Sequence, residues 1–413
     1  MRRRAGSARK IQDLFQKSYL RIDKPLKKSY NKEVMERIYL DHAATTPLDN
    51  EILEKMLPYF TENFGNANSH HGAGRKAMAA VDNARDTLAD LLNAKPNEIY
   101  FTSGGTEADN WAMLGGAYAQ REKGKTHILL SAIEHHAVLG AAERLAKEGF
   151  SVEYLPVNGQ GIVEPEVLKK GLREDTGLVA IMLANNETGA LQDIKTLAEI
   201  AHAKGSIFFC DGVQAAPYMH LDVKALGVDM LSISGHKFFG PKGVGALYIK
   251  SGVKIYPHAL GGEQERGLRG GTVNVPAVVG LSAAYAKKEA TMYENNAKIT
   301  ACKELFLKEI LSLGGVTVNG GSKEIPSIVN LCFDGLSSVD ILYKLDLRGV
   351  CAAAGSACAS SSVRPSHVLL AMGMSEERAK SCVRFSFGKG NDEEQAKKAA
   401  EILKEIVEEL RAK

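Results

Sequence analysis

A lysine directly after a predicted buried strand is the first residue of this sequence that could do chemistry. Lys237 ends the string Ser234-Gly235-His236-Lys237, which follows the apolar run 230–233. An unpaired ammonium is costly to bury, so desolvation lowers the pKa of such an amine and makes it a nucleophile that can form a Schiff base. Considered alone, the same pattern also fits a surface lysine in a loop.

An aspartate 26 residues before this lysine favours the chemical interpretation. Asp211 directly follows the apolar run 207–210, where a lone aspartate would more commonly be a turn or a helix cap. Pyridoxal 5′-phosphate needs a lysine for the Schiff base and a carboxylate that keeps its ring nitrogen protonated. The two residues, at the ends of neighbouring strands, therefore predict a site for this cofactor.

A glycine-rich turn could hold the phosphate of such a cofactor. Residues 102–107 read Thr-Ser-Gly-Gly-Thr-Glu, follow the apolar run 99–101 and open a predicted helix. Backbone N–H groups at a helix N-terminus favour a bound anion. The turn lacks the Gly-Lys-Ser/Thr ending of a nucleotide-binding P-loop, and a plain turn with a helix cap is the alternative.

Two adjacent histidines follow the apolar run 127–131, in the string Glu134-His135-His136. An imidazole at a strand end could stack on a cofactor ring and carry protons. Neighbouring residues of a helix do not face the same way, so one of the two would be catalytic. No convergent set of cysteines and histidines accompanies them, and no metal site is expected.

Six cysteines occur without any C-x-x-C pair, which argues against a disulfide scaffold or a zinc site and favours a reducing compartment such as the cytoplasm. Cys358 lies in a loop rich in glycine, serine and alanine (354–364), where a thiol could reach a substrate. Cys351 is ambiguous. The other four have strand-like or helix-like contexts and are expected to be buried and inert: Cys210, Cys302, Cys332 and Cys382.

An arginine stands inside the apolar strand-like run 382–387. Buried Arg384 needs a partner, and two are equally compatible with the sequence. One is a substrate carboxylate held by both guanidinium nitrogens, and the other is a structural salt bridge.

Short apolar runs that alternate with amphipathic helices must position these residues. The runs are 99–101, 127–131, 152–155, 178–183, 207–210, 230–233 and 244–249, with helices expected at 73–92, 106–121, 134–148 and 194–204. Such alternation predicts an α/β fold with a mostly parallel sheet between helices. Ligands of these folds bind beyond the carboxyl ends of the strands, where the polar residues above are found.

After about residue 290 the pattern predicts a smaller α+β domain. Strands are expected at 316–318, 327–333 and 382–387, and helices at 277–313, 337–348 and 392–411. We expect residues 49–289 to form a large cofactor-binding domain, and 37–48 with 290–413 to form the small domain that carries the cysteine loop.

The net charge of +3 is unevenly distributed over the 413 residues. Residues 1–37 hold twelve Lys or Arg and four Asp or Glu, so the remaining chain carries a net charge of −5, which argues against nucleic-acid binding. No apolar run is long enough to span a membrane. The basic extension 1–36 is expected to be a flexible tail of a cytoplasmic protein, with an organellar transit peptide as the alternative.

Several strings in the same order make the chain resemble the cysteine desulfurases, a group of the class V aminotransferase family with the fold type I of pyridoxal-phosphate enzymes. The strings are Tyr39-Leu-Asp-His-Ala-Ala-Thr-Thr-Pro47, Phe64-Gly-Asn66, Phe101-Thr-Ser-Gly-Gly-Thr-Glu107, Asn185-Asn-Glu-Thr-Gly189, Ser234-Gly-His-Lys237, Gly261-Gly-Glu-Gln-Glu-Arg-Gly-Leu-Arg-Gly-Gly-Thr272 and Gly355-Ser-Ala-Cys358. The spacing around Cys358 resembles the group with a long catalytic loop. The resemblance implies a seven-stranded sheet in the large domain and a homodimer with the active site at the subunit interface.

The resemblance also implies a role for each site residue. Lys237 would hold the cofactor covalently, Asp211 its ring nitrogen and Gln214 its phenolic oxygen, while His135 would stack on the ring. Phosphate would bind at the turn that contains Gly105, and the groups implied there are Thr106, Ser234, His236 and Thr272 of the other subunit. Asn186, which also lies beside the cofactor in this family, and Arg384 would bind the substrate's carboxylate.

The implied reaction converts L-cysteine to L-alanine and leaves a persulfide on Cys358, which a mobile loop would present to a sulfur acceptor. The alternatives are a selenocysteine lyase, a class V transaminase of the serine–pyruvate type and a catalytically silent sulfur-transfer scaffold; a transaminase has no need for Cys358. The acceptor stays open among iron–sulfur cluster assembly, thiolation of tRNA or a cofactor, and a nitrogenase-type pathway. Neither direct nucleic-acid binding nor membrane attachment is expected.

Overall fold

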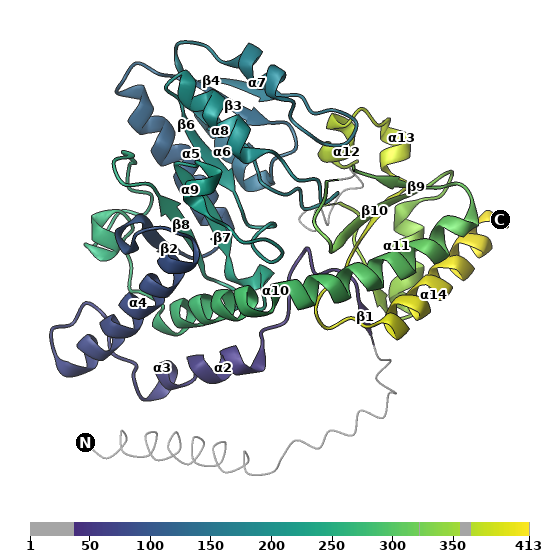
Figure 1. Cartoon of the computed structure of the whole chain (residues 1–413), viewed down its shortest axis with the longest axis horizontal. Coiled ribbons are helices and arrows are strands. Elements are labelled where there is room, and N and C mark those ends of the chain that lie inside the picture. Colours follow the sequence, from purple (N-terminus) through teal and green to yellow (C-terminus); the bar gives the residue numbers. More distant parts are fainter. Residues whose placement is uncertain (1–36, 322, 356–364, 413) are drawn as a thin grey trace, which may run out of the picture. The chain divides into compact units, whose positions relative to one another are not determined.

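A seven-stranded sheet lies at the centre of the protein, in a computed structural model that describes residues 37–321, 323–355 and 365–412 (Figure 1). Its strand order is β2-β8-β7-β6-β5-β3-β4. The strands are β2 (Ile99–Thr102), β3 (His127–Ser131), β4 (Ser151–Leu155), β5 (Thr176–Ala180), β6 (Ile207–Asp211), β7 (Met230–Ser234) and β8 (Gly245–Ile249). β8 runs antiparallel to both of its neighbours, and the other neighbouring strands are parallel. The predicted mostly parallel sheet of an α/β fold is confirmed.

The apolar runs form strands that are buried on both faces, because successive side chains point to opposite sides of a strand. Phe208 of β6 packs in one apolar core with Leu197 of helix α8 (Ile194–Ala203). The next residue, Phe209, packs in a second core with Trp111 of helix α5 (Gly105–Arg121). Helices therefore cover both faces of the sheet, and the uninterrupted apolar runs follow from this double burial.

The four helices expected around this sheet are all present, and each begins and ends within two residues of its expected range. Further helices surround the sheet as well. Besides α5 and α8, the helices around the sheet include α4 (Gly72–Leu91), α6 (His136–Lys147), α7 (Pro165–Gly171) and α9 (Val223–Leu226), with 3₁₀ turns η1 (Pro96–Glu98), η2 (Gly235–Lys237) and η3 (Gln264–Gly267). Two short helices, α2 (Asn50–Met56) and α3 (Pro58–Thr61), precede α4.

A second, antiparallel sheet is built from the last third of the chain, with the order β12-β10-β9. Its strands are β9 (Val316–Asn319), β10 (Ile328–Phe333) and β12 (Cys382–Ser386). The 36-residue helix α10 (Val275–Ile310) packs against α4 and, further along, against the terminal helix α14 (Glu393–Arg411), so it runs beside both sheets (Figure 1). The remaining elements are η4 (Leu311–Leu313), α11 (Ser338–Leu347), α12 (His367–Ala371) and α13 (Glu376–Ala379).

A two-stranded parallel sheet joins distant parts of the sequence. β1 (Ile38–Tyr39) pairs with β11 (Val350–Cys351), and neither was expected from the sequence, because a two-residue strand has no periodicity of its own. Residues 38–413 form one compact unit, and its division into a large and a small domain stays a prediction. The extension 1–36 and the loop residues 356–364 lie outside the described residues.

In the part of the chain that the structure describes, no helix has the length and apolar character needed to cross a membrane.

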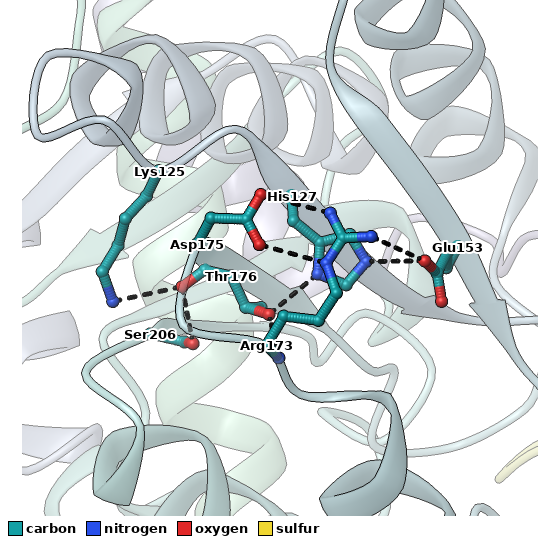
Figure 2. A network of polar contacts seen from close by, with 7 residues as sticks. All are labelled: Lys125, His127, Glu153, Arg173, Asp175, Thr176 and Ser206. Carbon is teal, nitrogen blue, oxygen red and sulfur yellow. Dashed lines mark hydrogen bonds and ion pairs between the residues drawn. The ribbon is translucent and has the colours of Figure 1, made fainter.

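A polar network fixes the amino ends of three central strands, as Figure 2 shows. Its members are Lys125, His127, Glu153, Arg173, Asp175, Thr176 and Ser206. The Thr176 hydroxyl accepts a hydrogen bond from the Arg173 N–H at 2.8 Å and lies 2.8 Å from Nδ1 of the fully buried His127. The Thr176 carbonyl accepts from the Ser206 hydroxyl at 2.9 Å. Thr176 therefore ties β3, β5 and the approach to β6 together at one edge of the sheet.

We predict that Thr176→Val lowers the free energy of unfolding by about 2 kcal/mol, because it leaves the Arg173 N–H and His127 Nδ1 without a hydrogen-bond partner. Thr176→Ser keeps the hydroxyl and should recover most of this loss. Chemical denaturation measures both, and a Thr176→Val protein as stable as the parent would contradict the prediction. Because the network lies at the edge opposite the polar strand ends, neither change should alter ligand binding there.

Candidate active site

A cavity of about 460 Å³ lies beyond the carboxyl ends of the parallel strands. Ten of the site residues expected from the sequence line it: Gly105, Thr106, His135, Asn186, Asp211, Gln214, Ser234, His236, Lys237 and Arg384. The strands β2, β3, β6 and β7 end at this edge, which is why residues far apart in the sequence meet here.

The lysine is held by the chain that follows β1. Lys237 lies in the 3₁₀ turn directly after β7, and its Nζ donates to the carbonyl oxygens of Ala43 and Ala44 at 2.5 and 3.1 Å. The Thr46 hydroxyl donates to the His236 carbonyl at 2.9 Å and accepts from the Phe239 N–H at 2.8 Å. The segment 43–46 therefore fixes both the backbone and the amine of the lysine turn.

The acidic residue opposite the lysine is buried in the floor of the cavity. Asp211 ends β6, and its Oδ1 accepts from the Val213 N–H at 2.9 Å. Burial raises the pKa of Asp211 to about 6, although the Val213 N–H and the charge of Lys237 both favour its ionised form. A cation brought against this carboxylate would therefore be bound strongly.

The turn before α5 offers an anion site. The first N–H groups of this 17-residue helix have no partner within the helix, and Thr106 and Ser234 stand beside them in the cavity wall. Gly245 makes the close packing possible, because a Cβ at this residue would lie 2.9 Å from the Gly104 Cα. These groups suit a phosphate, whose charge the helix N-terminus favours.

Two histidines in the wall are uncharged at neutral pH. Burial and, to a smaller extent, the neighbouring charge of Lys237 lower the pKa of His135 and of His236 to about 4. The Ala137 N–H donates to His135 Nδ1 at 3.1 Å, which leaves the ring proton on Nε2. A neutral, oriented imidazole of this kind can stack on an aromatic ring and exchange a proton through one known atom.

Arg384 has a structural partner and also faces the cavity. One terminal nitrogen pairs with Asp41 Oδ1 at 2.7 Å, and the other donates to the Asn186 carbonyl at 2.9 Å. Its Nε has no hydrogen-bond partner among the described residues, and the same holds for the buried Gln214 Oε1. Unpaired buried polar atoms are rare without a ligand or water, so their presence in the cavity wall fits a polar ligand.

Two expected site residues are not in the described wall. Thr272 is exposed between η3 and α10 and does not line this cavity. Cys358 lies outside the described residues. The chain on either side of 356–364 meets at one carboxylate: the Ser366 hydroxyl donates to Glu187 Oε2 at 2.5 Å, and Gly355, with φ of +66°, packs so closely that a Cβ would lie 3.0 Å from the same oxygen. The four cysteines expected to be inert are buried.

Three further ionisable residues in or beside the cavity were not singled out from the sequence. Asp41 holds Arg384, Lys242 adds a positive charge to the wall, and Asp109 is a buried acid one turn after Thr106. Asp41 lies inside the string Tyr39–Pro47, so its place in the family pattern was a signal. For Asp109, an acid on the apolar helix 106–121 was the available signal.

A further buried carboxyl lies next to His135. Glu134 Oε1 accepts from the Ser131 hydroxyl and from the Met182 N–H, both at 2.7 Å, while Oε2 has no partner among the described residues. Burial and, to a smaller extent, the charge of Asp211 raise the pKa of Glu134 to about 8. At neutral pH the folded protein therefore keeps a proton on Glu134.

This chain is similar to known proteins of one family. Residues 38–398 match the family described as Aminotransferase class-V. A protein of Methanosarcina thermophila named Cysteine desulfurase IscS is 46% identical over 375 residues, which are 91% of this chain and 93% of that protein. A protein of Bacillus subtilis named Putative cysteine desulfurase IscS 1 is 45% identical over 91% of this chain and all of that protein.

Solved structures agree with the fold. A structure titled NifS-like protein superposes with a TM-score of 0.85 at 35% identity and covers 91% of this chain and 100% of its own. A structure titled SspA in complex with cysteine has a TM-score of 0.76 at 34% identity and covers 85% of this chain and 99% of its own.

We predict that Glu134→Gln raises the stability of the protein above neutral pH. The unfolded glutamate loses its proton near its ordinary pKa and the folded one near 8, so wild-type stability falls as the pH rises between these values, by at most about 1.4 kcal/mol per pH unit. Glutamine removes this loss. Thermal unfolding from pH 4 to 9 should show curves that diverge as the pH rises, and parallel curves would contradict the prediction.

Proposed function

The chain belongs to the aminotransferase class-V family, and from this premise we propose that it is a cysteine desulfurase that removes sulfur from L-cysteine and releases L-alanine. The observation that carries the proposal is one cavity lined by the Lys237 amine, the Asp211 carboxyl, the N-terminus of α5 and Arg384. These groups suit a phosphorylated aromatic cofactor with a cationic ring and an amino-acid substrate. The identity of the relatives, over nine-tenths of this chain, supports the same activity.

The proposed cofactor is pyridoxal 5′-phosphate, which when bound supplies an electron sink for the bonds of the amino acid. Lys237 would hold it covalently and Asp211 would pair with its ring nitrogen. The phosphate would lie at the N-terminus of α5, bound by Thr106, Ser234 and His236. Gln214 would bond the ring's phenolic oxygen, and His135 would stack on the ring.

The substrate carboxylate would bind to Arg384 and Asn186. Asp41 keeps the guanidinium of Arg384 in one orientation, and the Arg384 Nε, which has no hydrogen-bond partner among the described residues, is a donor that a ligand could use. The Lys237 amine is then the group placed to move a proton at the substrate's Cα, while neutral His135 can exchange one through Nε2.

Sulfur removal is assigned to Cys358. Its thiolate would attack the substrate's sulfur, so that an S–S bond forms on Cys358 and the bond between sulfur and Cβ breaks. The electron pair of the broken bond stays on Cβ, which is later protonated to give the methyl group of alanine. A class V transaminase would need neither this thiol nor its sequence context, which favours the desulfurase.

Partners follow from the same proposal. We propose a homodimer in which Thr272 of the second subunit completes the phosphate site, with an iron–sulfur scaffold or a thiolation enzyme as the acceptor of the persulfide sulfur. Relatives named IscS support an acceptor of this kind. A large domain (49–289) that holds the cofactor and a small one (37–48, 290–413) that carries Arg384 and Cys358 would then enclose the substrate. A cytoplasmic location fits the cysteine usage.

Two substitutions test the assignment of roles. Lys237→Ala should abolish the covalently bound cofactor and its visible absorption, because it removes the amine that would form the covalent bond. Cys358→Ser should keep the absorption yet lower the release of alanine and sulfide from L-cysteine at least ~100-fold, because sulfur has no acceptor. Absorption spectra and product assays of the purified proteins measure both.

Matched controls are Lys250→Ala, at an exposed position directly after β8, and Cys351→Ser, which should change neither readout. Cofactor retained covalently in Lys237→Ala would refute the lysine assignment. Parental sulfide release by Cys358→Ser would refute the persulfide, while transamination products in place of alanine would refute the desulfurase.

We predict that Asp41→Asn raises KM for L-cysteine about tenfold with a smaller change in kcat. Loss of the charged pair leaves Arg384 without its anchor, which costs about 1.4 kcal/mol of carboxylate binding. Steady-state kinetics measure the split, with the exposed Asp340→Asn as the control. An unchanged KM would show that Asp41 does not orient Arg384.

A further inference from the structure

Asp109 is a buried carboxyl in the cavity wall that the proposed reaction does not use. It lies on α5, three residues after Thr106, and is 2% exposed. No lysine or arginine in the described part of the chain forms an ion pair with it. A buried carboxylate without a cation is costly, so its persistence in the wall needs an explanation.

One serine hydroxyl connects Asp109 to Asp211. The Ser232 Oγ lies 2.5 Å from Asp109 Oδ1. The parallel register of β6 and β7 sets Ser232 directly beside Asp211, and the Gly212 N–H donates to the Ser232 carbonyl at 3.1 Å. The Ser232 side chain also lowers the pKa of Asp211 against the larger effect of burial, so it favours the ionised form of that carboxyl. Asp109, Ser232 and Asp211 therefore form a short polar chain under the cavity.

The Ser232 hydroxyl carries one proton, so it can donate a hydrogen bond to only one of the two carboxyl groups at a time. If Asp109 were ionised, it would take the Ser232 proton for itself and leave Asp211 without it. If Asp109 is protonated, its own O–H can donate to Ser232 Oγ, and the Ser232 proton is then free for Asp211. The short distance of 2.5 Å between the two oxygens is compatible with either group as the donor. The groups around Asp109 therefore determine whether it is protonated.

The charged and titratable groups around Asp109 favour its protonated form. β6 contributes Asp211 and Cys210, whose thiol is also buried, and the turn after β3 contributes Glu134. Burial and the charge of Asp211 raise the pKa of Asp109 well above its ordinary value, and Glu134 adds to this only at a pH where it is itself ionised. The cation of this site, Lys237, acts on Asp211 instead.

We propose that Asp109 is a positioning residue that stays protonated, donates to Ser232 and thereby directs the Ser232 hydroxyl onto Asp211, which it keeps as the single ionised carboxyl against the cofactor's ring nitrogen. The inference rests on the proposed function for the cofactor, but the protonation of Asp109 is a property of the protein alone. Asp109 and Asp211 together then carry one negative charge, which would neutralise the single positive charge of the cofactor's ring.

The first test uses the unliganded protein. Asp109→Asn replaces a neutral carboxyl by a neutral amide of the same shape, whose NH₂ can still donate to Ser232. Above pH 4 the unfolded aspartate is ionised, so the wild-type protein must bind a proton at Asp109 when it folds, and this costs more stability as the pH rises. Asp109→Asn should therefore melt at least ~2 °C above the parent at pH 8, with the difference vanishing near pH 4. Asp90→Asn, an exposed acid on α4, is the control and should show no such trend.

The second test measures the dissociation constant of pyridoxal 5′-phosphate by absorption titration. Asp109→Asn should bind the cofactor within about threefold of the parent, whereas Ser232→Ala should bind it about tenfold more weakly, because Asp211 loses a hydrogen bond to its charge. Ser232→Ala should cause the same loss in the Asp109→Asn background.

The outcomes are distinguishable. If Asp109→Asn is less stable than the parent at pH 8, Asp109 is ionised in the folded protein and the inference is wrong. If Asp109→Asn weakens cofactor binding tenfold or more, a second negative charge is required and the inference is wrong as well. If the wild-type protein binds no pyridoxal 5′-phosphate, the proposed function fails, while the melting curves still decide the state of Asp109.

Discussion

The parallel pairing of β6 with β7 is the constraint on which the site depends. It ends two buried strands at one edge of the sheet, so that Asp211 and the turn containing Lys237 face one cavity. Parallel strands need a helical crossover between them, here the segment with α9, and this accounts for the 26 residues between acid and amine. Because both strands are buried on both faces, a slip in their register would displace large apolar side chains from two cores at once.

Burial beneath this edge gives the site its electrostatic character. Asp109, Glu134 and Asp211 are all fully or almost fully buried, and the desolvation of each raises its pKa. The same burial lowers the pKa of His135 and His236. The cavity therefore favours neutral side chains around a small number of charges. The groups that would bind a cationic ring and an anionic phosphate lower the stability of the protein when no ligand is bound. Such a loss of stability in favour of function is common at binding sites.

The antiparallel sheet and the amino-terminal strand complete the cavity from the other side. Arg384 projects from β12, Asp41 follows β1, and residues 43–46 continue from Asp41 to hold the Lys237 amine. A single short segment thus touches both the proposed substrate-binding cation and the proposed cofactor-binding amine. The positions of the Arg384 guanidinium and the Lys237 amine are therefore coupled through the backbone of residues 41–46. A displacement of β1 would move both groups.

The sequence by itself determined the central strands and the chemical groups of the site. Each buried strand is a local apolar run, and the polar residue that ends it, such as Asp211 or Ser234, is adjacent in the chain, so local patterns sufficed. Only the tertiary structure decided which groups become partners. Asp41 and Arg384 are 343 residues apart, and Asp109 and Ser232 are 123 apart. Their contacts depend on how β1 lies beside β11 and how α5 packs over β7. A two-residue strand or a single buried acid has no sequence periodicity from which its distant partner could be predicted.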